Sequence, residues 1–228
     1  MPGQPAAATD VIRSAILDVV EQRGAELVNR YYSDEPFAGS LFDGLGDNPP
    51  DRFTTDDLLA ASLLDVRFKP EAVRALVTER VADELLSRVP TDLPLWKANY
   101  DADLGEQSAA GQLWLKVRAI PGIGRTRASK LLARKRPRLL PIIDSVVSGA
   151  LGLGNAGSWA ALQTALDDAQ IRSAIDGMAP TLDGAAPTTL RLLDVATWMR
   201  FSESDNARDV RRSLGLPVEP RKALKARS

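Results

Sequence analysis

The sequence has 228 residues, of which 44% are hydrophobic, so the chain is long enough to bury a substantial core. Its net charge is −1, which argues against a uniformly basic, nucleic-acid-coating protein. The absence of cysteine and histidine excludes disulfides, zinc–thiolate and iron–sulfur sites, histidine-ligated metals and catalytic triads built on either residue, which leaves acid–base chemistry to Asp, Glu, Lys or Tyr.

The first half of the chain predicts helices interrupted by one long connection. Residues 1–9 are expected to form a disordered lead-in. Asp10 can cap a helix that runs to about Tyr31, because apolar residues recur there at three- and four-residue spacing. A Gly/Pro/Asp-rich connection over 33–52 follows, and loops of this length are often functional. Further helices are predicted over 58–68, 70–89 and 106–119.

The second half predicts further helices separated by glycines and prolines. Pro121, Gly122 and Gly124 break the chain sharply before the next helix. Helices are predicted over 125–135, 145–150, 158–178 and 188–201. No segment alternates at period two, so no strand is predicted. The sequence therefore predicts an all-α helical bundle that forms one domain over 10–205, followed by a polar and basic tail over 206–228.

The ends and the apolar runs of the chain predict its location. The N-terminus has no basic region followed by an apolar stretch, as a secretion signal would have. No apolar run approaches the roughly 20 residues that span a bilayer. We therefore expect a cytoplasmic protein that makes no contact with a membrane.

The most specific pattern lies in 117–132, within a helix-hairpin-helix element predicted over 112–135. Gly122 and Gly124 bracket Ile123, and each glycine permits a positive φ and the close approach of another backbone. Ile123 is expected to fill the gap between the two helices. The N–H groups that follow the glycines open the next helix, where they and the helix dipole favour a phosphate group.

The charge around this hairpin has one sign. Between Glu106 and Asp144 the chain has nine basic residues and no acidic residue. Basic residues at i, i+3 and i+7 of the second helix are predicted to share one face. We therefore expect the phosphate backbone of DNA as the partner. The predicted backbone-binding residues are Gly122, Gly124, Arg125, Thr126, Arg127, Lys130 and Arg134. An ordinary tight turn beside a solvated basic face is the alternative.

These residues resemble the helix-hairpin-helix DNA glycosylase superfamily over about 113–151. Residues 120–128 match its hairpin pattern of Leu-Pro-Gly-Val-Gly-Arg, a polar pair and Ala. In the superfamily a catalytic Asp follows an extended, proline-containing link at the head of another helix, and Asp144 holds that place, 20 residues after Gly124. The whole chain also resembles an uncharacterised family that is common in actinobacteria.

The resemblance implies a glycosylase-like fold and a role in DNA repair. Asp144 would stabilise the oxocarbenium-like sugar that forms when the base is excised. The enzyme would be monofunctional, because Thr126 stands where bifunctional members carry lysine. The resemblance implies no cofactor other than a monovalent cation at the hairpin carbonyls.

Asp144 also has a purely structural interpretation, because Asp is a favoured N-cap residue. Three hypotheses therefore stay open: a DNA glycosylase that uses Asp144, a catalytically inactive helix-hairpin-helix DNA-binding protein, and an interaction module whose basic helix meets an acidic protein or RNA. A base-sized pocket with Asp144 at its wall would favour the first, and a buried, capping Asp144 the second. Among the tryptophans, Trp114 and Trp198 have apolar neighbours and are expected in the core.

Overall fold

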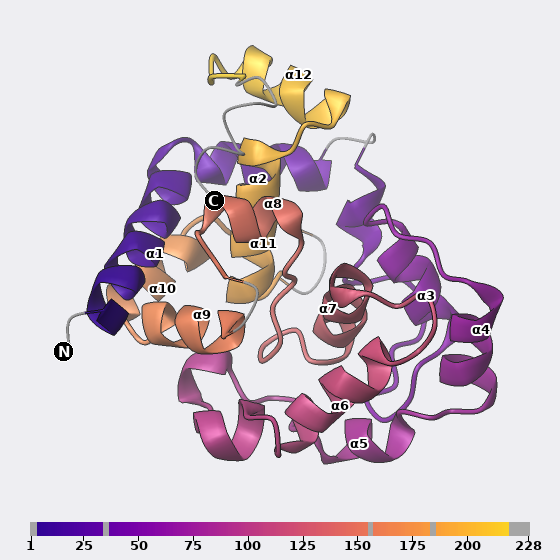
Figure 1. The fold of residues 1–228 in the computed structure, drawn as a ribbon. Helices are drawn as coiled ribbons and strands as arrows, with labels where there is room; N and C mark the ends of the chain where they lie inside the picture. The colour runs from indigo at the N-terminus through magenta and orange to yellow at the C-terminus, as the bar shows by residue number, and fades with distance from the viewer. Residues whose placement is uncertain (1–3, 34–36, 155–156, 183–185, 219–228) are drawn as a thin grey trace. The chain divides into compact units, whose positions relative to one another are not determined.

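The computed structural model describes residues 4–33, 37–154, 157–182 and 186–218. It confirms the predicted all-α class, because these ranges contain twelve α-helices, four short 3₁₀ or π segments and no strand. The chain divides into two compact units (Figure 1). Unit 1 is formed by Met1–Phe37 and Ile143–Ser228, and unit 2 by Ala38–Ile142. The domain predicted over 10–205 thus spans both units.

Unit 1 is organised around the helix α11 (Thr189–Phe201), which is buried along nearly its whole length. A helix that is covered on nearly all sides lies inside its domain, and the charged residues of α11, such as Arg191 and Asp194, pair with each other there. Helices from both ends of the chain surround it: α1 (Gln4–Glu21), α2 (Gly24–Ser33), α8 (Ser145–Ala150), α10 (Ala169–Asp176) and α12 (Asp205–Ser213). The remaining helix, α9 (Ser158–Leu166), packs against α1 and α10 (Figure 1).

The single helix predicted from Asp10 to Tyr31 is wrong, because two helices, α1 and α2, occupy this segment. The chain breaks at Arg23, whose φ of 63° lies in the left-handed region. Gly24 follows at a crowded position, where a Cβ atom would lie 2.4 Å from the sulfur of Met178. The helix predicted over 158–178 is likewise divided into α9 and α10, and Asp168 caps the second of them.

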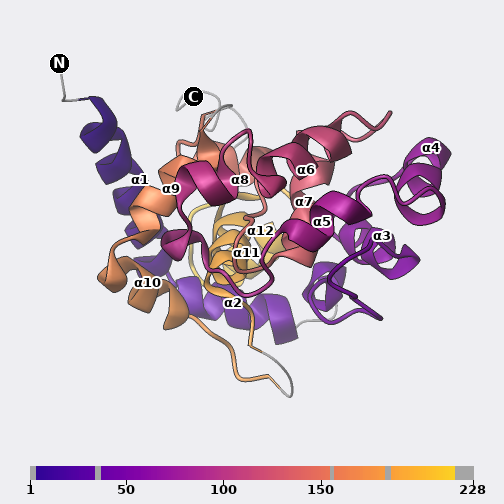
Figure 2. The ribbon, with the colours of Figure 1, turned by 90° about the horizontal axis from the view of Figure 1, so that it is seen from below.

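Unit 2 contains five α-helices and the shorter segments. The α-helices are α3 (Thr55–Ser62), α4 (Pro70–Val73), α5 (Asp83–Arg88), α6 (Ala109–Arg118) and α7 (Arg125–Lys135). The short segments are η1 (Ala38–Leu41), η2 (Arg74–Thr78), η3 (Leu95–Lys97) and η4 (Tyr100–Leu104). Helix α6 packs against α5 and α7, and α3 packs against the other side of α7 (Figure 2). The helix predicted over 58–68 ends early, at Ser62, and Asp65 beyond it has a positive φ. The helix predicted over 70–89 is divided into α4, η2 and α5, with a second positive-φ residue, Arg80, at the break before α5.

The two ends of the chain are more helical than predicted. Helix α1 begins at Gln4, inside the predicted lead-in. Helix α12 occupies part of the predicted tail, and the side chain of Ser204 caps its first turn. The basic end over 219–228 lies outside the described residues. Within the described ranges, no helix is both long and apolar enough to cross a bilayer.

Candidate nucleic-acid interface

The predicted hairpin joins α6 to α7 within unit 2. Helix α6 ends at Arg118 and α7 begins at Arg125, as the sequence predicts for α7. Ile123 lies between the glycines with 3% of its surface exposed, and its N–H donates to the carbonyl of Ile120 at 2.9 Å. The expectation that Ile123 fills the gap between the helices agrees with this burial. The buried Ile123 side chain holds the turn in place, while the backbone of the flanking glycines stays exposed.

The two glycines of the hairpin have different roles. Gly122 has a φ of 84°, and a Cβ atom there would lie 3.0 Å from Cδ of Lys69. Gly124 has a φ of −89° and is the N-cap of α7 without a side-chain hydrogen bond. The space where its Cβ would stand is open to 4 Å. Gly122 therefore adopts the positive φ that a glycine permits, whereas Gly124 does not, and at Gly124 the absent side chain leaves room for a close approach.

Two arginines lie at the mouth of the hairpin. Arg118 is exposed at the end of α6, and Arg125 is half-exposed at the start of α7. Burial lowers the pKa of the Arg125 guanidinium, and the nearby positive charge of Arg118 lowers this pKa further. Thr126 is half-exposed beside them. The two like charges repel each other, so an anion between them would be stabilised by both.

The predicted basic face of α7 is not a solvent face. Lys130 is 7% exposed, and its Nζ donates to the carbonyl of Leu64 at 2.6 Å. Arg134 is 2% exposed, and its guanidinium donates to the carbonyls of Phe42 and Leu45. The helical periodicity places these residues together correctly, but two distant connections cover that side of α7. Lys130 and Arg134 therefore hold the fold together instead of facing a partner.

Arg127 has an intermediate position on α7. It is half-buried, and its Nε donates to the carbonyl of Arg67 at 2.7 Å. This bond fixes the connection between α3 and α4 against the first turn of α7. Part of the Arg127 side chain stays accessible at the edge of the hairpin.

Sequence reasoning missed the contribution of this connection, whose residues Arg67 and Lys69 are both exposed. The methylene chain of Lys69 lies over Gly122, so this exposed side chain passes along the hairpin. The exposed acids Asp65 and Glu71 bracket these cations, so 65–71 carries no net charge. The excess of positive charge thus comes from the hairpin itself. No periodic signal links a residue in this connection to a turn so far along the chain.

A buried charge cluster supports α7 from behind. Asp57 forms ion pairs with Arg134 at 3.4 Å and with Lys135, and all three side chains are 0–1% exposed. Burial lowers the pKa of Lys135, and the hydrogen bond and charge of Asp57 oppose this shift. The next residue, Arg136, donates to the carbonyls of Pro50 and Val89 at 2.8 Å each. Three consecutive cations therefore fasten the long connection before α3.

Asp144 belongs to unit 1 and caps α8. Its Oδ1 accepts the backbone N–H groups of Val146 and Val147, each at 3.0 Å, and the residue is 9% exposed. The structural interpretation of Asp144 as an N-cap is thus confirmed.

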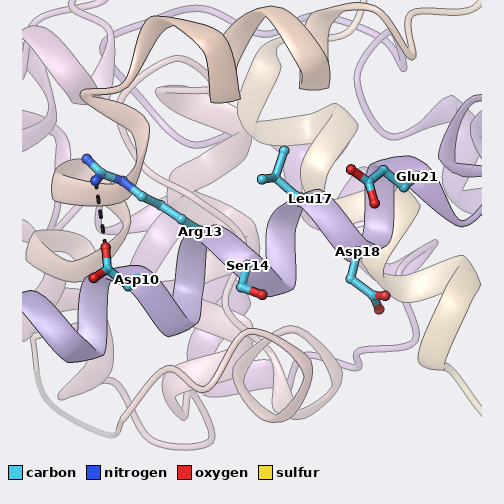
Figure 3. Close-up of a pocket in the computed structure, with 6 residues that line it drawn as sticks. All are labelled: Asp10, Arg13, Ser14, Leu17, Asp18 and Glu21. Atoms are coloured by element: carbon cyan, nitrogen blue, oxygen red, sulfur yellow. Dashed lines mark ion pairs between the residues drawn. The ribbon is translucent and has the colours of Figure 1, made fainter.

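A pocket in unit 1 does not involve Asp144. It is an open groove of about 460 Å³ that follows one face of α1 (Figure 3). Asp10, Arg13, Ser14, Leu17, Asp18 and Glu21 line it. Their side chains all come from a single helix, and none of them belongs to the predicted site.

This chain matches no curated protein and no solved structure. A protein-family model described as "Family of unknown function (DUF6308)" matches residues 24–201. The matched range includes the hairpin, the buried cluster of Asp57 and the capping Asp144.

Proposed function

The chain belongs to the DUF6308 family, a family of unknown function, and we propose from its own residues that it binds the phosphate backbone of DNA through the hairpin between α6 and α7. The observation that carries this proposal is the open space at Gly124. An N-cap without a side chain lets a phosphate oxygen come close to the first turn of α7. Arg118, Arg125 and Lys69 supply positive charge around this point.

The mode of binding follows from the kinds of group at the hairpin. Backbone N–H groups and flexible cations contact phosphates and carry no base-edge pattern, so the binding is independent of sequence. The carbonyl of Ile120 accepts one N–H within the turn, from Ile123. It keeps a second lone pair, so this oxygen is a suitable ligand for the monovalent cation that the resemblance implies.

The test is a titration of fluorescent duplex DNA over a series of salt concentrations. Wild type is compared with Arg118→Gln/Arg125→Gln. The matched control is Arg74→Gln/Arg88→Gln, which removes the same charge from two exposed arginines of the same unit. We expect wild type and control to lose affinity steeply with salt. The hairpin variant should bind more weakly, with a slope reduced by about one per lost phosphate contact.

Two results would refute DNA binding at this site. One is the absence of binding at low salt, which would leave an acidic protein or RNA as the partner of the basic residues. The other is an equal loss of affinity in the hairpin variant and the control, which would mean that only the overall charge matters.

Base excision with Asp144 is the second candidate function. It is favoured by the fixed position of a carboxylate at the head of α8, where the resemblance expects it. The burial of Asp144 supports binding without catalysis more than it supports excision. Asp144→Asn separates the two, because Asn also caps helices but carries no charge. Release of a modified base by wild type and not by this variant would establish excision. If neither protein releases a base, the hypothesis of base excision is refuted.

A further inference from the structure

One half-exposed aromatic side chain stands beside the hairpin and has no part in the proposed phosphate contact. Trp114 lies on α6, one helical turn before Arg118. The sequence predicts Trp114 in the core, but the structure leaves it half-exposed while Leu113 and Val117 take the buried positions. Leu115, next to it, is 47% exposed. The rim of the hairpin therefore presents apolar surface together with charge.

Trp114 and Arg118 form a cation–π pair. The guanidinium carbon of Arg118 lies 5.4 Å from the centre of the Trp114 ring. An arginine placed over a tryptophan ring is attracted by the π-electrons of that ring, and the guanidinium still carries N–H donors that suit a phosphate group. Arg118 is the last residue of α6, and α6 packs against α7, so the pair lies beside the hairpin; the charge of Arg118 also lowers the pKa of Arg125.

We propose that the Trp114–Arg118 pair stacks an unpaired base of a DNA strand whose phosphate is bound at the hairpin. This inference rests on the proposed function and narrows its substrate to DNA with a single-stranded segment. Flat aromatic and guanidinium groups beside a cationic backbone track bind single strands, because every base offers a π-face and the phosphates supply the charge. A continuous duplex hides its base faces in the stack, so it can use only the phosphate contacts.

The experiment compares three probes of equal length: an oligothymidylate, an abasic oligomer with the same phosphates, and a continuous duplex. Wild type is expected to bind the oligothymidylate about five- to a hundred-fold more tightly than the abasic oligomer, which is the usual contribution of a stacked base. Trp114→Leu should abolish this difference, and Trp114→Phe, which keeps an aromatic face, should retain most of it. Trp96→Leu is the matched control, since Trp96 is another half-exposed tryptophan of unit 2 on a separate helix.

The outcomes separate this inference from the proposed function. If wild type binds the abasic oligomer as tightly as the oligothymidylate, the stacking is refuted. The phosphate contact then still stands, provided that Arg118→Gln/Arg125→Gln weakens duplex binding. If Trp114→Leu weakens duplex binding as much as single-strand binding, the pair supports the hairpin only and stacking is refuted too. If no probe binds wild type at low salt, both proposals fail.

Discussion

The carboxylate of Asp57 is shared by two buried cations, so its removal should damage unit 2 severely. Asp57→Asn leaves Arg134 and Lys135 without their counter-charge in the interior, and breaking such a pair costs about 3–5 kcal/mol. The free energy of unfolding in urea measures this loss. Asp92→Asn makes the same chemical change at an exposed position and should alter the free energy by less than about 0.5 kcal/mol. A loss as small as that of the control would show that the cluster does not stabilise the fold.

Arg211 holds α12 in unit 1 by a different kind of contact. Its guanidinium donates to the carbonyls of Met199 and Ser202 at the end of α11. Burial and neighbouring arginines lower its pKa to about 10, so it still carries its charge at neutral pH. We expect Arg211→Lys to reduce stability by about 1–3 kcal/mol, because one ammonium cannot reproduce the planar fork. The exposed Arg212 is the matched control, and Arg212→Lys should leave the thermal midpoint unchanged.

Arg134 shows which properties of a single residue could be predicted from the sequence and which could not. Its spacing from Lys130 and Arg127 is a property of the helix and could be predicted. Its partners, the carbonyls of Phe42 and Leu45, come from a connection about ninety residues earlier. A helical period shows which residues share a face, but it does not show what covers that face. The exposed Arg118 and the half-exposed Arg125, which carry no periodic signal, form the accessible charge instead.

The hairpin between α6 and α7 offers a matched pair of glycine substitutions. Gly122→Ala places a Cβ at positive φ and against Lys69, and should destabilise the protein by about 1 kcal/mol or more. Gly124→Ala places the same methyl group in open space at an ordinary φ, so the thermal midpoint should hardly change. That methyl group would nevertheless stand where a phosphate approaches. DNA affinity of Gly124→Ala should therefore fall without a loss of stability, and unchanged affinity would contradict the proposed contact.

The starts and caps of helices could be predicted where the residues that determine them are neighbours in the sequence. The start of α7 follows from the glycines before it, and Asp144 was identified as the cap of α8. Both features depend on neighbouring residues only. The break between α1 and α2 was missed, although Gly24 marks it, because the apolar period continues across Arg23. The close contact of Gly24 with Met178, which explains the break, joins segments far apart in the chain.

At the scale of the whole molecule, unit 2 is one continuous segment, whereas unit 1 is assembled from both ends of the chain. The charge cluster of Asp57 and the hairpin both lie inside unit 2. We therefore expect residues 38–142, expressed alone, to show helical circular dichroism, a cooperative thermal transition and salt-dependent DNA binding. Residues 143–228 alone lack α1 and α2 and should not unfold cooperatively. A disordered 38–142 fragment would show that the two units fold only together.

The two-part construction of unit 1 could not be predicted from periodicity, because each helix signals its own apolar face and not the partner of that face. The sequence of α11 does not indicate that α2 packs against this helix. Composition and length are compatible with one domain or two, and the single domain predicted over 10–205 does not separate the two units.

The insertion of unit 2 also sets an order of events on the ribosome. Helix α2 leaves the exit tunnel early, but α11, against which it packs, is synthesised only after the whole of 38–142. At usual rates of translation, this segment takes about 5–20 s to make. During that interval α1 and α2 lack the partners that come later in the chain, α9, α10 and α11, while unit 2 can complete its own core. The nascent chain thus carries a folded unit 2 together with the exposed apolar faces of α1 and α2, and chaperones bind exposed apolar segments of this kind.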